Sequence, residues 1–247
     1  MDKARFLSAC DKIIHKDVNQ NFVGTIGTLG EKTLHSVLKN YFEPSQNSQE
    51  INILNFVADI VNENGIIEIQ TGNFDKLKKK LETFLLLNKV TVVFPIIHQK
   101  WIFWVDNETG ELSKKRKSNK TGVPYQAFYE LYKISDFLLC DNFNFCVVLI
   151  DAEEYKSLDG YGKDKKSRAT KIDKIPIDIF DEIYIKNLED YQKLLPKNLP
   201  SQFTTADLKK LTKLSPRAIS SGISVMKKIG LIKQIGKNGR SFLYELI

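Results

Sequence analysis

Residues 59–70 read DIVNENGIIEIQ and predict two β-strands that meet at a turn. The first strand runs into Asp59, the Asn and Gly residues that follow supply the turn, and the second strand ends at Gln70. Successive side chains of a strand point to opposite faces, so Glu68 and Gln70 share one face of the second strand. Pairing of the two strands would therefore bring Asp59 close to Glu68.

This acidic pair favours a metal site. Two carboxylates on one sheet face repel each other and resist desolvation unless a cation neutralises them, and the hard cation Mg²⁺ prefers oxygen ligands. A third acid precedes the pair, because Glu31 lies in the first turn of an expected helix over residues 31–42. Two simpler interpretations stay open: the hairpin has a solvated acidic face, and Glu31 is a helix-start charge stabilised by the helix dipole.

The order of these acids resembles the PD-(D/E)xK nuclease superfamily. Glu31 on an early helix is followed by Asp59 and then, after a gap of eight residues, by Glu68-Ile69-Gln70, a helix and further strands. The resemblance covers residues 20–185 and implies an α/β fold of the restriction-endonuclease-like type, a mixed sheet flanked by helices. It also implies that Glu31, Asp59 and Glu68 bind Mg²⁺ or Mn²⁺, and that Asp59, Glu68 and Gln70 form the catalytic site.

Two residues depart from the superfamily's motif. Ala58 stands in the place of its Pro, and Gln70 replaces the Lys that orients or activates the attacking water, so no positive charge is supplied there. The resemblance implies a Mg²⁺-dependent endonuclease that hydrolyses DNA phosphodiester bonds. A catalytically inactive DNA-binding regulator with a nuclease fold is the alternative that Gln70 raises. An RNA-directed enzyme is a third interpretation, because basic charge does not separate the two polymers.

Apolar patterns predict the other elements of the first domain. Residues 74–85 favour a helix and residues 90–97 a strand buried on both faces, so a strand, a helix and a strand in succession indicate a parallel crossover. Trp101 and Trp104 fall on opposite faces of their expected strand, so no base-stacking platform is indicated. The remaining expected elements are a helix over 3–20, strands over 51–58, 100–106 and 145–150, and a short helix over 151–155.

Two groups of cations in this domain are candidate phosphate contacts. Residues 78–80 are three lysines on the expected helix, where a solvated face is the first interpretation and phosphate contact the alternative. Residues 114–120 hold five cations in seven residues. Within them, Lys115 and Arg116 are candidate contacts to the DNA backbone, and a solvated loop is the alternative.

The net charge of +7 is concentrated at the C-terminal end of the chain. Residues 197–247 contain ten Lys and Arg against two acids, a net charge of +8, so residues 1–196 carry about −1. Such asymmetry favours a polyanionic partner for the tail, although a solvated lysine-rich surface has the same composition.

Two helices and a hairpin in the tail resemble a bacterial winged helix-turn-helix domain. A helix over 205–211 precedes a second helix that Ser215-Pro216 opens and Gly230 ends, and a hairpin with a basic tip over 236–240 follows. Winged helices also serve as protein-docking modules. The candidate DNA contacts are Arg217, Ser220, Ser221, Lys237 and Arg240.

Length and composition allow two globular domains, since the chain has 247 residues, 42% of them hydrophobic and 27% charged. We expect a nuclease-like domain over 1–185 and a winged-helix domain over 186–247. No long apolar run or signal core appears, so we expect a cytoplasmic protein outside the membrane. The glycines and lysines of residues 157–168 lack GxxxxGK[ST] spacing, so no nucleotide cofactor is expected. A homodimer would suit double-strand cleavage by one site per chain.

Overall fold

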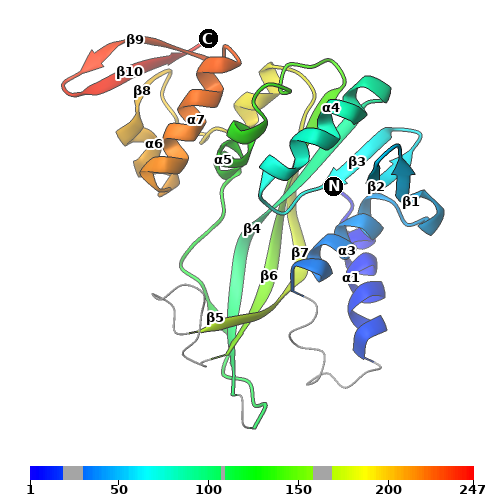
Figure 1. Ribbon diagram of the computed structural model, residues 1–247. Helices are drawn as coiled ribbons and strands as arrows, with labels where there is room; N and C mark the ends of the chain where they lie inside the picture. The colour runs from blue at the N-terminus through cyan, green and yellow to red at the C-terminus, as the bar shows by residue number, and fades with distance from the viewer. Residues whose placement is uncertain (19–29, 107–108, 158–168) are drawn as a thin grey trace. The chain divides into compact units, whose positions relative to one another are not determined.

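A computed structural model describes residues 1–18, 30–106, 109–157 and 169–247 (Figure 1). Only the backbone is described for residues 15–18 and 30–32. The chain divides into two compact units. The first unit comprises Met1–Gln49, Ile97–Gly122 and Leu149–Asp181, and the second comprises Glu50–Ile96, Val123–Val148 and Glu182–Ile247.

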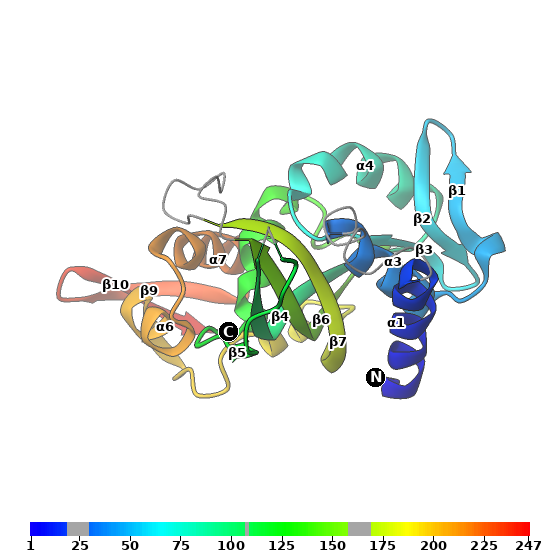
Figure 2. The ribbon, with the colours of Figure 1, turned by 90° about the horizontal axis from the view of Figure 1, so that it is seen from below.

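Each unit has its own helices. In the first unit, α1 (Lys3–Val18) lies beside α3 (Gly30–Phe42), as Figures 1 and 2 both show. Phe6 of α1 and Tyr41 of α3 are buried in this contact, with ring centroids 5.5 Å apart. The helices of the second unit are α4 (Lys78–Leu87), α5 (Ala127–Leu131), α6 (Thr205–Thr212) and α7 (Pro216–Lys228), with short 3-10 turns at Phe74–Leu77, Pro124–Gln126, Tyr132–Ile134 and Glu189–Leu194.

In the described part of the chain, one large sheet has seven strands in the order β1-β2-β3-β4-β6-β7, with β5 paired to β4. The sheet is mixed, because β2 and β3 are antiparallel whereas β3 and β4 are parallel. Its strands are β1 (Gln49–Ile53), β2 (Phe56–Asn62), β3 (Gly65–Ile69), β4 (Val90–Val105), β5 (Arg116–Lys117), β6 (Phe143–Ser157) and β7 (Thr170–Ile185).

The turn between β2 and β3 fixes the hairpin that holds the acidic pair. Gly65 has a φ of +106°, and a Cβ added there would lie 2.4 Å from the carbonyl oxygen of Lys89. Glycine is therefore required by both the backbone conformation and the available space. The close approach also lets the Ile66 amide donate to the same Lys89 carbonyl (2.8 Å), which sets the start of β3 against the start of β4.

The core beside this hairpin is rich in phenylalanine. Phe74 lies edge-on to Phe94 of β4 and Phe145 of β6, with centroids 5.3 and 6.2 Å away. Phe84 of α4 packs edge-on to Phe56 of β2 at 6.0 Å. These contacts hold α4 against the strands, so every residue of β3 is buried.

The C-terminal elements form a small assembly of their own within the second unit. Helices α6 and α7 pack together, and β8 (Gln202–Thr204), β10 (Ser241–Leu246) and β9 (Ile232–Asn238) pair in that order as an antiparallel sheet. Thr204 and Ser215 cap the two helices, because their side chains accept hydrogen bonds from the amides of Asp207 and Ala218.

Several predictions of local structure are confirmed: a mixed α/β fold with a large sheet flanked by helices, the parallel crossover from β3 to β4, and helices close to 3–20, 31–42, 74–85, 205–211 and 217–229. None of the helices in the described ranges is long and apolar enough to cross a membrane. The predicted domain boundary falls where β7 ends, at Ile185, and the division itself stays a prediction.

Three predictions of local structure were wrong. Residues 51–58 are not one strand, because the chain turns at Leu54. The φ of Leu54 is 52°, a positive value that is uncommon for residues other than glycine. The strands expected over 90–97 and 100–106 form one continuous strand, β4, which ends at Val105. The expected short helix over 151–155 is part of β6, where Lys100 of β4 pairs with Glu154 and Lys115, next to β5, pairs with Glu153.

Candidate active site

Asp59 and Glu68 come together where the backbone pairing of β2 and β3 ends. That pairing runs as far as Ile60 and Ile67, and the next step of the same register sets Asp59 opposite Glu68. The two side chains replace the missing backbone bonds: the Asp59 amide donates to Glu68 Oε1 (3.2 Å), and the Ile69 amide donates to Asp59 Oδ2 (2.8 Å). The predicted convergence of the two acids is therefore present.

Glu68 is buried, contrary to the interpretation of a solvated acidic face. Its exposure is 2%, because β3 lies between β2 and β4 and is covered on both faces. A buried carboxylate needs a counter-charge. Lys80 of α4 supplies it, with Nζ 2.8 Å from Glu68 Oε2 and a side chain that is 26% exposed.

Lys80 was missed because residues 78–80 were assigned to the solvated face of their helix. On α4, the buried side is marked by Leu77, Leu81 and Phe84. At 100° per residue, Lys80 borders that side, whereas Lys79 lies far from it. Helical geometry excludes Lys79 and leaves Lys78 and Lys80 on either edge of the buried side, and the structure shows that Lys80 reaches the sheet.

The electrostatics of the pair depart from those of ordinary carboxylates. Burial raises the pKa of Glu68 to about 7, and the nearby charge of Asp59 adds to the increase; Lys80 opposes both effects by its charge and its hydrogen bond. Near neutral pH, Glu68 thus exchanges a proton readily. This is the behaviour expected of a carboxyl group that acts in proton transfer or awaits a cation.

Gln70 directly follows β3, and its side chain forms a hydrogen bond with the backbone of the next turn. Its amide group donates to the carbonyl of Gly72, and its backbone amide donates to the Val93 carbonyl (2.9 Å), which continues the pairing of β3 with β4. The Gln70 side chain is half-buried. In this conformation the amide stabilises the turn after β3.

The residues present fit a divalent cation in part. Carboxylate oxygens from Asp59 and Glu68 are donors that Mg²⁺ accepts, and a cation would relieve the repulsion that raises the pKa of Glu68. Glu31, the third predicted ligand, lies in α3 of the first unit, and its side chain falls outside the described residues. Among the side chains that are described, no three His, Cys, Asp or Glu residues form a group able to hold a metal ion.

The candidate DNA contacts on α7 differ in how exposed their side chains are. Ser220 and Ser224 are exposed on α7, and Lys227 is exposed beside them, although the sequence interpretation passed over this lysine. Ser221 is half-buried. Arg217 is exposed but lies over the ring of Tyr129 in α5, with its guanidinium carbon 5.6 Å from the ring centroid.

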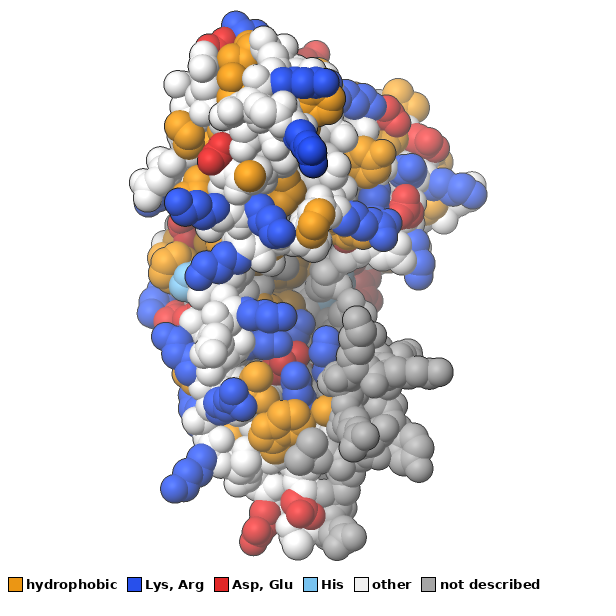
Figure 3. All heavy atoms as spheres, turned by 90° about the vertical axis from the view of Figure 1, so that its left-hand side faces the viewer, with side chains coloured by type: hydrophobic (Ala, Val, Ile, Leu, Met, Phe, Trp, Pro, Cys, Tyr) orange, Lys and Arg blue, Asp and Glu red, His pale blue; other side chains and the backbone are white. Residues whose placement is uncertain are grey.

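The tip of the β9–β10 hairpin presents the other two predicted contacts of the tail. Lys237 and Arg240 are exposed on either side of Gly239, whose φ of 59° allows the tight turn. Lys237 Nζ lies 5.4 Å from the ring centroid of Phe242, an exposed residue of β10. Figure 3 shows one face of the protein, on which Lys and Arg side chains outnumber acids and lie among hydrophobic side chains.

The predicted basic loop is a paired segment. Arg116 and Lys117 form β5 and pair with Ile102 and Trp101 of β4. Lys115 is neutralised by Glu153 of β6, with 2.7 Å between Nζ and Oε1, and Arg116 is exposed. The basic segment over residues 158–168 lies outside the described residues.

The chain is similar to an uncharacterized protein and to one protein family. An uncharacterized protein of Treponema pallidum (strain Nichols) is 28% identical over 223 residues, which cover 90% of this chain and 87% of that protein. No solved structure matches the chain significantly. The family described as "Domain of unknown function (DUF8091)" matches residues 32–186, a range that includes Asp59, Glu68 and Lys80. Since this match spans more than half of the 247 residues, the chain belongs to the DUF8091 family.

Proposed function

We propose that the protein is a metal-dependent nuclease that hydrolyses DNA phosphodiester bonds. The observation that carries the proposal is the convergence of Asp59 with buried Glu68, whose second oxygen is bound by Lys80. Placing two acids and a lysine at one point of a sheet costs desolvation energy, which a structural role alone does not require. The mixed sheet with flanking helices is compatible with a restriction-endonuclease-like fold.

In this mechanism, Asp59 and Glu68 would hold the cation. A bound Mg²⁺ would stabilise charge on the attacked phosphate and lower the pKa of a coordinated water. Glu68 loses its proton near neutral pH, so it is available as a ligand under physiological conditions. Lys80 would supply the positive charge that Gln70 lacks and would stabilise the anionic transition state, while Gln70 holds the turn beside the site.

The C-terminal assembly is proposed to be a winged helix-turn-helix that delivers DNA to this site. Its order of two helices and a hairpin, the net charge of +8 over residues 197–247 and the exposed Ser220, Ser224, Lys227, Lys237 and Arg240 support this role. Exposed cations on α7 and the hairpin would contact phosphates, and the small serines would permit close approach to bases.

Cleavage of supercoiled and linear DNA in Mg²⁺, Mn²⁺ or EDTA tests the proposal. We expect metal-dependent cleavage that Asp59→Ala, Glu68→Gln and Lys80→Met each reduce by at least about a hundredfold, the loss typical of removing a group that stabilises transition-state charge. Lys79→Met is the matched control, because Lys79 is exposed on the same helix. Cleavage that persists in Asp59→Ala would show that the acidic pair is not the active site.

A catalytically inactive DNA-binding regulator is the second candidate, and the conformation of Gln70 favours it. The Gln70 side chain donates to the Gly72 carbonyl, and it supplies no positive charge at a position where the resembled superfamily usually has a Lys. A gel-shift assay of DNA binding in EDTA, combined with the cleavage assay, distinguishes the nuclease from the inactive regulator. Retained binding with no cleavage in either metal supports the regulator, whereas cleavage that requires Lys80 supports the nuclease.

A further inference from the structure

The distal half of β4 carries an aromatic cluster on one face. Trp101 and Phe103 are two residues apart and half-exposed, so they share this face. Phe103 stacks on Tyr155 of the neighbouring strand β6, with centroids 5.2 Å apart and planes inclined by 10°. The prediction that no base-stacking platform forms considered only Trp101 and Trp104, which lie on opposite faces of the strand. It missed this cluster, because the cluster forms between residues of two strands.

A basic segment lies along one side of this cluster. Lys117 of β5 pairs with Trp101, so the basic segment runs alongside the aromatic strand. Four of its cations are exposed and form no ion pair with any described residue, so their charges are available to an external anion. These four are Lys114, Arg116, Lys117 and Lys120. Lys117 lies opposite Trp101 and shares the face of the aromatic cluster, whereas Arg116 lies opposite Ile102 and points to the other face.

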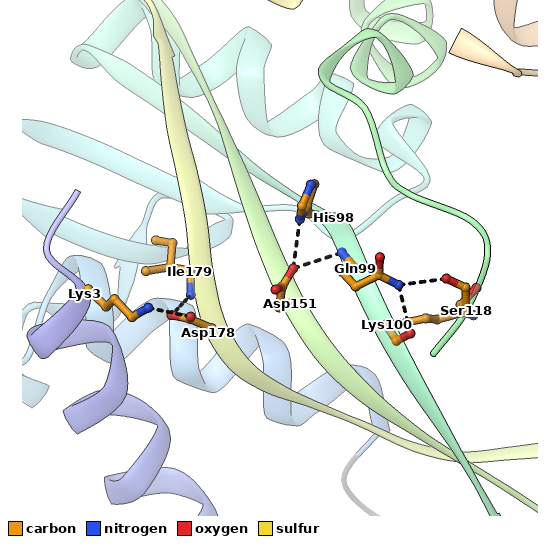
Figure 4. A network of polar contacts seen from close by, with 8 residues as sticks. All are labelled: Lys3, His98, Gln99, Lys100, Ser118, Asp151, Asp178 and Ile179. Atoms are coloured by element: carbon orange, nitrogen blue, oxygen red, sulfur yellow. Dashed lines mark hydrogen bonds and ion pairs between the residues drawn. The ribbon is translucent and has the colours of Figure 1, made fainter. Parts of the chain in front are cut away.

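The basic segment is anchored to β4 by hydrogen bonds that Figure 4 shows in part. The Gln99 side-chain amide donates to the Ser118 carbonyl (2.9 Å), and the Ser118 amide donates to the Lys100 carbonyl (2.9 Å). Gln99 is itself held through its backbone amide, which donates to Asp151 of β6 (3.0 Å). The cations are therefore presented from a paired segment at a fixed position beside Trp101.

Lys115 occupies the place where a planar ligand would stack. Its ammonium lies 5.1 Å from the Trp101 centroid and 5.9 Å from the Phe103 centroid, and it pairs with Glu153 at 2.7 Å. Lys115 is 45% exposed, and exposed ion pairs and cation–π contacts are individually weak. Stacking of a nucleobase on an aromatic side chain is stronger, and the displaced Lys115 could then contact a phosphate.

We propose that this face binds single-stranded nucleic acid, with bases stacked on Trp101 and Phe103 and phosphates bound by the β5 segment. Interleaved aromatic and cationic side chains are the combination that sequence-tolerant single-strand binding uses, whereas bases in a duplex are not accessible for stacking. This inference rests on the proposed function for the class of polymer. It adds that the nucleic acid bound by the first unit is single-stranded.

The two tryptophans make this surface directly observable. The chain contains only two Trp residues, and both lie in β4. In the Trp104→Phe variant, all tryptophan fluorescence arises from Trp101. We expect dT12 or rU12, added in EDTA, to quench this fluorescence, while inorganic polyphosphate and a blunt duplex of the same length bind without quenching. The DNA and RNA arms show which polymer is preferred.

Affinity measurements on variants complete the test. Trp101→Leu should weaken oligonucleotide binding roughly tenfold, as loss of one stacked base predicts, and Trp104→Leu should leave it within about twofold. Circular dichroism confirms that each variant is folded. Lys117→Gln should reduce the salt dependence of binding by about 0.7 log units per log unit of salt, which is one single-strand phosphate contact.

Three results would overturn the inference: no binding of either oligonucleotide, binding without quenching of Trp101, or equal affinity in Trp101→Leu and the parent. None depends on cleavage, because every titration is done in EDTA. Failure of the nuclease proposal appears instead as DNA that stays intact with Mg²⁺, so the two failures are distinguishable.

Discussion

Replacing Glu68 with Gln should change how the protein's stability depends on pH. Burial and the charge of Asp59 raise the pKa of Glu68 from 4.5 to about 7 in the folded chain. Between these two values the folded protein keeps a proton that the unfolded chain has released, so the free energy of unfolding falls as pH rises. At about 1.4 kcal/mol per unit, this amounts to about 3 kcal/mol of stability lost between pH 4.5 and pH 7.

Urea unfolding at pH values from 4.5 to 8, in EDTA, measures this effect as the difference between the parent and Glu68→Gln. Gln keeps the size of the side chain but does not titrate, so the difference isolates Glu68 from the other acids. The parent should lose stability relative to the variant as pH rises, most steeply from pH 5 to 7. Parallel pH profiles of the two proteins would refute the reasoning.

Glu154 provides a control, because its effect on stability should change with pH in the opposite direction. It is also buried, at 1% exposure, and burial is the largest influence on its pKa and acts to raise it. The hydrogen bond and charge of Lys100, with the charge of Lys156, outweigh burial and lower the pKa of Glu154 overall. Its stabilising contribution is therefore complete above pH 4.5 and is lost as pH falls below that value. Relative to Glu154→Gln, the parent should gain stability as pH rises toward 4.5, measured in urea at pH values below 4.5, and the difference should stay constant from pH 4.5 to 8.

The remaining predictions concern the same unit of the structure. Mg²⁺ should raise the melting temperature more at pH 8 than at pH 6, because below pH 7 the metal must displace a proton; calorimetry checks this. Lys80→Ala should destabilise the fold by about 2 kcal/mol in urea at pH 8, while Lys79→Ala should have little effect. Gly222→Ala should cost about 1 to 3 kcal/mol, because the added Cβ would lie 2.2 Å from buried Tyr125 Oη; Gly236→Ala, with open space around it, is the control.

Much of the candidate site could be predicted from local sequence. Alternating apolar residues and a turn with Gly65 are enough to specify a hairpin, and a hairpin of that length places Asp59 opposite Glu68. The C-terminal helices could also be predicted, because Thr204 and Ser215 cap them through contacts within three residues. Such features depend on neighbours in the sequence, so patterns of a few residues determine them.

The errors arose where contacts over long sequence separations decide the outcome. Acidic residues of β6 were assigned to a helix because their partners, Lys100 and Lys115, lie far away in the sequence. The turn at Leu54 contains no glycine or proline that would indicate a turn in the sequence. Trp101 belongs to an aromatic cluster only because β6 brings Tyr155 beside Phe103.

The sequence by itself thus determined the order of the elements, the pairing of the two acids and the basic character of the tail. Only the tertiary structure decided that Glu68 is buried and that Lys80 is the cation beside it. The physical reason is that solvation and charge pairing depend on which elements cover a strand. Here α4 and the parallel strand β4 cover β3, and they convert an ordinary acidic hairpin into a site where one carboxyl group titrates near neutral pH.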